Sequence, residues 1–116
     1  MNLKILTDYG IDWERGVARC MGDADFYISM LKMFLEDDAL IRAKTADGKE
    51  LFEYLHKLKG VCGNLEMGEL FSALCPLVEL LRSENPNGDE VSLLMDRAER
   101  EHTRVSDGIK ALLADG

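Results

Sequence analysis

One face of a predicted helix near the middle of the chain carries an unusual set of residues around a histidine. Phe52, His56, Lys59, Gly60 and Gly63 follow the spacing i, i+4, i+7, i+8 and i+11, so an α-helix places them on one side. A glycine inside a helix costs about 1 kcal/mol relative to alanine. Such a cost is tolerated where space or a close approach to the backbone is needed. We therefore expect Gly60 to leave the imidazole uncovered and Lys59 to reach an anion on the ring, an arrangement that suits a phosphorylated histidine.

Each of these features also has an ordinary explanation. A single histidine on a helix is usually a surface residue or a satisfied core residue, and Lys57 and Lys59 have the character of solvated surface charges. Gly60 and Gly63 could instead serve close packing between helices. The residue pattern alone therefore suggests a site without naming its chemistry.

The elements that position this face are predicted to be helices, because the apolar spacing is helical along nearly the whole chain. Asp12 is expected to cap a short first helix, and Asp23 precedes a second helix that ends or bends near Asp37. Residues 39–46 are ambiguous, and a third helix begins near Lys49. Its apolar stripe is Leu51, Leu55, Leu58, Cys62 and Leu65.

Two further helices complete the prediction. A fourth helix carries regularly spaced leucines from Leu70 to Leu81, and Pro76 is expected to kink or break it. Asp89 is predicted to cap a long last helix whose apolar stripe includes His102, so this histidine should be structural and at least partly buried. Short turns favour antiparallel neighbours. We therefore predict an all-α fold, an up-down four-helix bundle with a short additional N-terminal helix.

Composition limits the classes of partner. The chain has 116 residues, enough for one domain, with 14 Lys plus Arg against 22 Asp plus Glu and a formal net charge of −8. Binding to nucleic acid or to an anionic membrane surface needs clustered positive charge, so neither is expected. No apolar run is long enough to span a bilayer, and no signal peptide is visible. The expected partner is another protein.

The cysteines predict neither a disulfide framework nor a metal site. Cys20, Cys62 and Cys75 are an odd number and lack the spacing of metal ligands. All three lie among apolar residues, where free cysteine usually fills space in a core. The expected compartment is the reducing cytoplasm.

The segment YLHKLKGVCGNLEMGEL, residues 54–70, resembles the signature of histidine phosphotransfer domains. That signature is His, any residue, an apolar residue, Lys and Gly, followed closely by Asn and Leu. The residues from Gly22 to Asp37 are similar to the family's second helix, which typically opens with Gly-Asp, and Asp47 matches an acidic helix start. The resemblance covers residues 11–113. The chain departs from the family at Glu66, where glycine is usual, at Pro76, and in a shorter segment between Phe34 and Asp47.

This resemblance implies a phosphocarrier, in which His56 is the phosphoacceptor and Lys59 neutralises phosphoryl oxygens. Gly60 and Gly63 would admit the partner, and the other docking residues implied are Phe52, Val61 and Asn64. The implied partners are receiver domains of response regulators and a hybrid histidine kinase. The receiver would supply Mg²⁺, and the carrier, a monomer, would need no cofactor or metal of its own. No nucleotide-binding signature is visible, so the chain is not expected to be an enzyme.

Three alternatives remain open at this point. The chain could be the phosphoacceptor domain of a chemotaxis-type histidine kinase, although Met1 and the short segment after the last helix favour a free-standing protein. It could be a helical interaction module in which His56 is incidental. A metal site using His56 and His102 is the third, and the two histidines have no shared ligand spacing.

Overall fold

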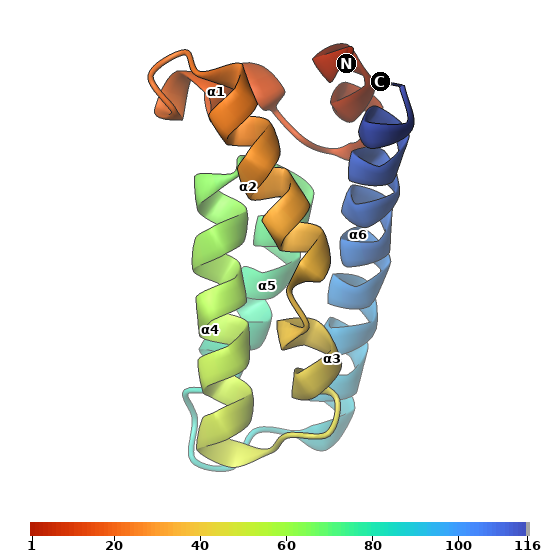
Figure 1. The fold of residues 1–116 in the computed structure, drawn as a ribbon. Helices are drawn as coiled ribbons and strands as arrows, with labels where there is room; N and C mark the ends of the chain where they lie inside the picture. Colours follow the sequence, from red (N-terminus) through yellow and green to blue (C-terminus); the bar gives the residue numbers. More distant parts are fainter. Residues whose placement is uncertain (116) are drawn as a thin grey trace.

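The computed structural model describes residues 1–115, and helices account for most of them (Figure 1). No strand occurs within this range, so the prediction of an all-α fold is confirmed. In chain order the elements are the 3-10 helix η1 (Leu3–Tyr9) and the α-helices α1 (Trp13–Arg19), α2 (Ala24–Glu36), α3 (Ala39–Ala43), α4 (Gly48–Asn64), α5 (Gly68–Leu80) and α6 (Gly88–Ala114). The helix η1 was not predicted.

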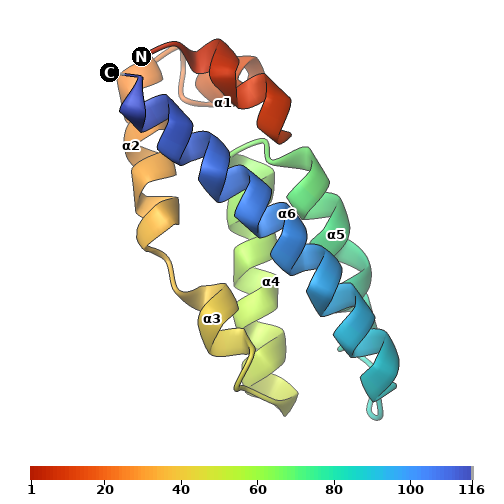
Figure 2. The ribbon, with the colours of Figure 1, turned by 90° about the vertical axis from the view of Figure 1, so that its right-hand side faces the viewer.

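The molecule is elongated, with extents of 45 × 24 × 20 Å, and its longest helices lie lengthwise (Figures 1 and 2). Helix α5 packs between α4 and α6, while α3 packs against α4 and α2 contacts α6. Helix η1 packs on α6, so the two ends of the chain lie together. There the backbone N–H of Asn2 donates to Asp115 Oδ2 at 2.7 Å. The side of α4 that faces away from the core, which includes His56 and Gly60, is exposed.

The caps of two helices show how the boundaries are set. Asp12 caps α1 as predicted, since its carboxylate accepts from the backbone N–H of Arg15 at 3.2 Å. The predicted cap of α6 was wrong. Asn87 caps this helix, because its side-chain oxygen accepts from the N–H groups of Asp89 and Glu90 at 2.9 and 3.1 Å. An oxygen two residues before Asp89 satisfies these N–H groups, so Asp89 already lies in the first turn.

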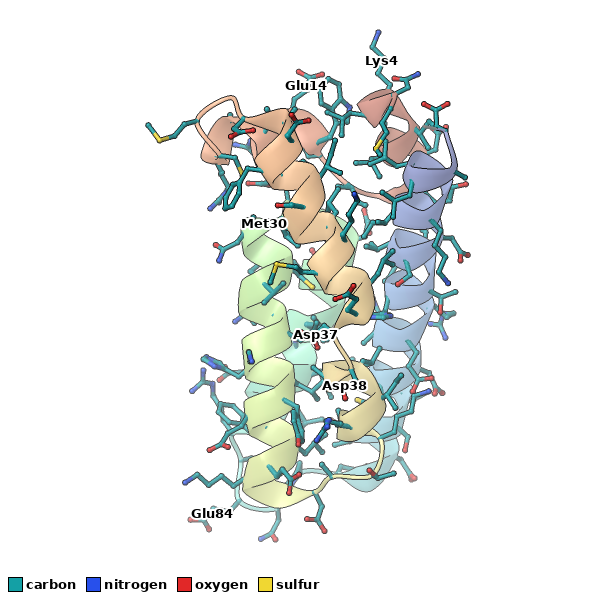
Figure 3. All side chains as sticks on the ribbon, in the orientation of Figure 1. Lys4, Glu14, Met30, Asp37, Asp38 and Glu84 are labelled. Carbon is teal, nitrogen blue, oxygen red and sulfur yellow. The ribbon has the colours of Figure 1, made fainter. Side chains whose placement is uncertain are left out.

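The joint between α2 and α3 resolves the segment that was ambiguous in the sequence. Helix α2 ends at Glu36, and Asp37 and Asp38 lie between the two helices (Figure 3). The Asp37 carboxylate accepts from the N–H of Ala39 at 2.7 Å, which gives the short helix α3 its start. The chain therefore turns at the two aspartates, as the prediction of an end or bend near Asp37 required.

Pro76 does not break α5. We expected a kink or a break at Pro76. The helix is continuous from Gly68 to Leu80 with Pro76 inside it, so no break occurs. Proline lacks the N–H that would bond to the carbonyl of Ser72. Both Pro76 and Ser72 are exposed. Water can therefore bond to that carbonyl, which reduces the cost of the missing hydrogen bond.

The core lies along the inner side of α4. Leu55, Leu58, Cys62 and Leu65 are buried as predicted, and Leu51 is half-buried against them. Burial raises the pKa of the Cys62 thiol to about 12, because the charged thiolate would lose its solvation. Cys62 is therefore a neutral core residue, in agreement with the space-filling role expected for it.

The end of α4 closes with a residue in the left-handed conformation that is not glycine. Glu66 has φ +60°, and its N–H donates to the Gly63 carbonyl at 3.3 Å. The N–H of Met67 donates to the Cys62 carbonyl at 3.0 Å. This pair of hydrogen bonds is the Schellman arrangement, which usually has glycine at the left-handed position. The backbone thus adopts a glycine geometry at the position where the resemblance led us to expect glycine.

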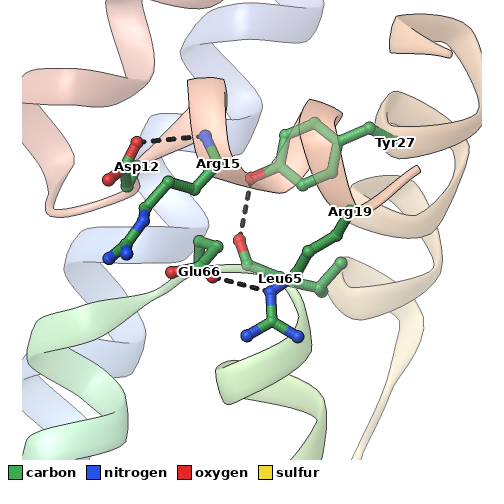
Figure 4. A network of polar contacts seen from close by, with 6 residues as sticks. All are labelled: Asp12, Arg15, Arg19, Tyr27, Leu65 and Glu66. Carbon is green, nitrogen blue, oxygen red and sulfur yellow. Dashed lines mark hydrogen bonds and ion pairs between the residues drawn. The ribbon is translucent and has the colours of Figure 1, made fainter. Parts of the chain in front are cut away.

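Contacts from α1 and α2 hold Glu66 in this geometry (Figure 4). Arg19 Nε donates to Glu66 Oε1 at 2.7 Å, and the N–H of Asp12 donates to the Glu66 carbonyl at 2.9 Å. The hydroxyl of the buried Tyr27 donates to the Leu65 carbonyl at 2.8 Å. Burial also raises the pKa of Tyr27, so this hydroxyl remains a donor.

We predict that Glu66→Gly is more stable than Glu66→Ala by about 1 kcal/mol. Both changes remove the carboxylate that pairs with Arg19, but only glycine removes the Cβ from the left-handed backbone. That conformation costs an L residue about 1–2 kcal/mol, while glycine loses about 0.5–1 kcal/mol more conformational freedom on folding. Chemical denaturation of the two variants measures the difference. Equal stabilities would show that the backbone strain is no larger than the conformational freedom that glycine loses on folding.

The partial burial of His102 was predicted correctly. This histidine is half-buried on α6, and its ring lies 5.2 Å from the ring of Phe34, centroid to centroid. Burial lowers the pKa of His102, and the positive charge of Lys44 lowers it further, while Asp37 opposes both. The neutral form is therefore favoured in the folded protein.

We expect the fold to lose stability through His102 as the pH falls. The unfolded chain takes up this proton near pH 6.5, the ordinary pKa, whereas the folded chain takes it up only at lower pH. The free energy of unfolding should therefore decrease below about pH 6.5 and keep this contribution above it. Denaturation at several pH values measures how the free energy of unfolding changes with pH. This dependence should be weaker in His102→Leu, whereas His56→Gln, which keeps His102, should retain the contribution of His102. An unchanged dependence in His102→Leu would contradict the assignment.

Candidate functional site

His56 lies halfway along α4 with its side chain exposed. The buried stripe of the helix dictates this position. Leu55 and Leu58 face the core, and successive residues turn by about 100°, so His56 must point outward. No hydrogen bond to its ring occurs within residues 1–115, so both ring nitrogens are open to a partner.

An aromatic ring one turn earlier flanks the imidazole. The ring centroids of Phe52 and His56 are 5.4 Å apart, and the two planes are inclined by 21°, a stacked arrangement. The guanidinium carbon of Arg82 lies 5.2 Å from the Phe52 ring centroid. Phe52 therefore touches both His56 on its own helix and a cation from the turn after α5.

A second cation lies on a second ring at the same α4–α5 seam. The Nζ atom of Lys59 is 5.8 Å from the ring centroid of Phe71, which belongs to α5. The ammonium group is thus held on an aromatic face, and it must leave that face to reach a group on His56. Lys57 and Lys59 follow His56 closely on α4, and Arg82 contacts its neighbour Phe52, in a chain whose formal net charge is −8.

The two glycines of this face have different surroundings. A Cβ built on Gly60 meets nothing within 4 Å, so this residue does not serve helix packing. A Cβ on Gly63 would lie 3.2 Å from Cε2 of Phe71, so Gly63 makes room for that ring. By contrast, Gly16 and Gly108 are buried, and a Cβ on either would collide with a tyrosine. The chain therefore contains packing glycines, and Gly60 is not one of them.

The remaining predicted docking residues are not all brought to His56. Asn64 is exposed at the end of α4, two turns beyond the histidine and about 80° around the helix from it. Val61 is half-buried and packs against the core, about 140° around the helix from His56. The structure thus groups Phe52 and Gly60 with the histidine, leaves Asn64 at the edge of this face, and places Val61 on the other side.

Sequence reasoning missed the contribution of α5. The sequence had assigned neither Phe71 nor Arg82 to the site. Periodicity identifies which residues share a face of one helix, but it does not say which residues of another helix lie beside them. The only available signal was the antiparallel pairing of consecutive helices, which brings the end of α5 near the start of α4.

Within residues 1–115, no group of three or more His, Cys, Asp and Glu side chains could hold a metal ion. In the same part of the chain, no helix combines the length and apolar character needed to cross a membrane. The site that the structure shows is an exposed imidazole stacked on Phe52.

Comparison of the chain with protein-family models, with curated proteins and with solved structures finds no significant match in any of the three. Arguments about function therefore rest on the residues of this face and on the resemblance of residues 54–70.

We predict opposite roles for the two glycines in stability. Gly60→Ala should raise the free energy of unfolding by up to about 1 kcal/mol, because alanine favours the helix and its methyl group meets nothing. Gly63→Ala should gain less or lose stability, because Phe71 must move. Chemical denaturation of both variants tests this. A loss of about 1–3 kcal/mol in Gly60→Ala would mean that Gly60 supports packing after all.

Proposed function

We propose that the chain is a histidine phosphotransfer domain that carries a phosphoryl group on His56 between aspartates of receiver domains. The observation that carries this proposal is the exposed imidazole halfway along α4, beside helix backbone left bare at Gly60. A phosphoryl donor is a bulky folded domain, so the acceptor ring must be reachable without unfolding of either partner. Lys59, three residues after His56 on α4, also favours the arrival of a dianionic group.

The fold we propose for this role is an up-down four-helix bundle. Its four arms would be α2 together with α3, then α4, α5 and α6, with η1 and α1 as additions at one end. The packing of α5 between α4 and α6 and of α3 against α4 supports this arrangement.

The transfer step is a displacement at phosphorus. The unprotonated ring nitrogen of His56 attacks the phosphorus atom of the receiver's aspartyl phosphate, an N–P bond forms, and the P–O bond to the aspartate breaks. The aspartate leaves as a carboxylate, and the other ring nitrogen keeps its proton. The reverse sequence on a second receiver returns the imidazole. Such transfers depend chiefly on positioning and charge stabilisation.

Lys59, Gly60 and Asn64 have distinct roles in this proposal. The Lys59 ammonium would exchange the face of Phe71 for the phosphoryl oxygens. Gly60 would let the receiver's active site close over the ring, and Asn64 would contact the receiver further along α4. Gly63 acts indirectly, since it lets Phe71 sit under Lys59. Val61 has weaker support because it lies away from His56.

The proposed partners are response-regulator receiver domains and a hybrid histidine kinase, with Mg²⁺ held by the receiver. The chain would act as a monomer and as a carrier without a kinase activity of its own. A cytoplasmic location belongs to the same proposal.

Transfer from phosphorylated receivers tests the proposal. The wild type should take up phosphate and His56→Gln should take up none, while His102→Leu, which removes the other histidine, should transfer normally. Lys59→Ala should slow transfer by roughly tenfold to a hundredfold, the equivalent of one charge-assisted hydrogen bond. Circular dichroism and denaturation check that each variant folds.

Two results would reject this function. If the folded wild type takes up no phosphate from any receiver yet binds a partner tightly, it is a helical interaction module. If His102→Leu abolishes phosphate uptake while His56→Gln retains it, His102 is the phosphoacceptor and the assignment of His56 is wrong.

A further inference from the structure

We propose that Phe52 and Arg82 hold the imidazole of His56 in the orientation from which it reacts, Phe52 by direct contact and Arg82 through Phe52. Both are positioning residues, and this inference rests on the proposed function. It explains why an exposed side chain, with no hydrogen bond to its ring among the described residues, is nevertheless stacked against one neighbour.

The stack restricts the imidazole on one side. Phe52 and His56 are one turn apart on α4, with ring centroids separated by 5.4 Å and planes inclined by 21°. This separation lies within the range in which aromatic pairs attract each other. The Phe52 face therefore favours the ring orientation that lies parallel to it, and the opposite face of His56 stays open.

Arg82 holds Phe52 from the turn that follows α5. Its guanidinium carbon lies 5.2 Å from the Phe52 ring centroid, within cation–π distance. Its Nε atom lies 3.3 Å from Oε2 of Glu79, one turn earlier on α5. The carboxylate helps to orient the guanidinium, and the guanidinium in turn limits the movement of the Phe52 ring.

The Phe52 ring has an alternative apolar position, and Arg82 is needed to hold the ring against His56. Phe52 and Arg82 both line an open hollow together with Leu51, Leu81 and Val91. A ring freed from Arg82 can turn toward these apolar side chains and away from His56. The guanidinium thus favours the stacked position over the hollow.

The expected size of the effect follows from side-chain rotamers. A histidine on a helix has two common χ1 wells and a roughly two-fold χ2, so an unrestrained ring divides among about four orientations. Loss of the stack should therefore reduce the rate of transfer at saturating receiver by about fourfold. Loss of Arg82 should reduce it by about twofold, because Phe52 still stacks for part of the time. The concentration of receiver at half-maximal rate should change little.

The experiment compares Phe52→Leu, Phe52→Tyr and Arg82→Gln in the full chain. Transfer rates are measured against phosphorylated receiver concentration, and the ring protons of His56 are observed by NMR without any receiver. Phe52→Leu should slow saturated transfer and remove the ring-current shift of the His56 protons, whereas Phe52→Tyr should restore both. Arg82→Gln should show intermediate values of both.

Matched controls and the contrary outcomes make the test decisive. Phe26→Leu removes an exposed phenylalanine from α2, and Arg97→Gln removes an exposed arginine from α6, and neither should alter rate or shift. If Phe52→Leu changes only the half-saturating concentration, Phe52 is a docking residue and the positioning role is wrong. If the wild type accepts phosphate and Phe52→Leu accepts it at the same saturated rate, only the positioning role fails. If the wild type accepts phosphate from no receiver, the proposed function fails and the positioning role falls with it.

Discussion

The rest of the structure depends on the fact that α4 can bury only one of its faces. Leu55, Leu58 and Cys62 are fully or almost fully buried, and together they fix the rotation of the helix about its axis. Once that rotation is set, the direction of every other residue of α4 follows from the turn of about 100° per residue. His56 and Gly60 therefore reach the surface as a consequence of core packing. A helix rotated by one residue would bury the imidazole and expose a leucine, so the site and the core are determined together.

Contacts at the end of α4 connect this helix to α1 and α2 in the first third of the chain. Tyr27 passes over the buried Gly16, where any Cβ would collide with its ring, and its hydroxyl reaches the Leu65 carbonyl. A buried donor and acceptor that lost each other would each cost about 1–3 kcal/mol, so this contact fixes α1 and α2 on the end of α4. The left-handed Glu66 then directs the chain into α5. In this way α5 arrives alongside α4 with Phe71 next to Gly63.

The sequence was informative wherever one periodic pattern decides the outcome. The buried stripe of α4, the outward direction of His56 and the half-burial of His102 all follow from spacing, and all were predicted correctly. Predictions were less successful where the local structure depends on a contact between distant segments or on the exposure of one position to water. Pro76 remains within a continuous helix because its surroundings are exposed, and exposure at a single position is not encoded in the residue type. Arg82 belongs to the site through a contact across two helices, which no spacing rule on one helix can reveal.

In an acidic protein, a lysine near the proposed phosphoacceptor could easily be paired with a carboxylate, and the aromatic ring of Phe71 offers Lys59 a different contact. A lysine paired with a carboxylate would have to give up that partner before it could neutralise a phosphoryl group. Lys59 lies over Phe71 instead, and in residues 1–115 it forms no ion pair. A cation on an exposed ring is held by about 0.5–1 kcal/mol, whereas a hydrogen bond to a charged group contributes about 1.5–3 kcal/mol. On the proposed function, the ammonium can therefore wait on the ring with its charge uncompensated and transfer to the phosphoryl oxygens when they arrive. Gly63 makes this position of Phe71 possible, since a side chain there would displace the ring.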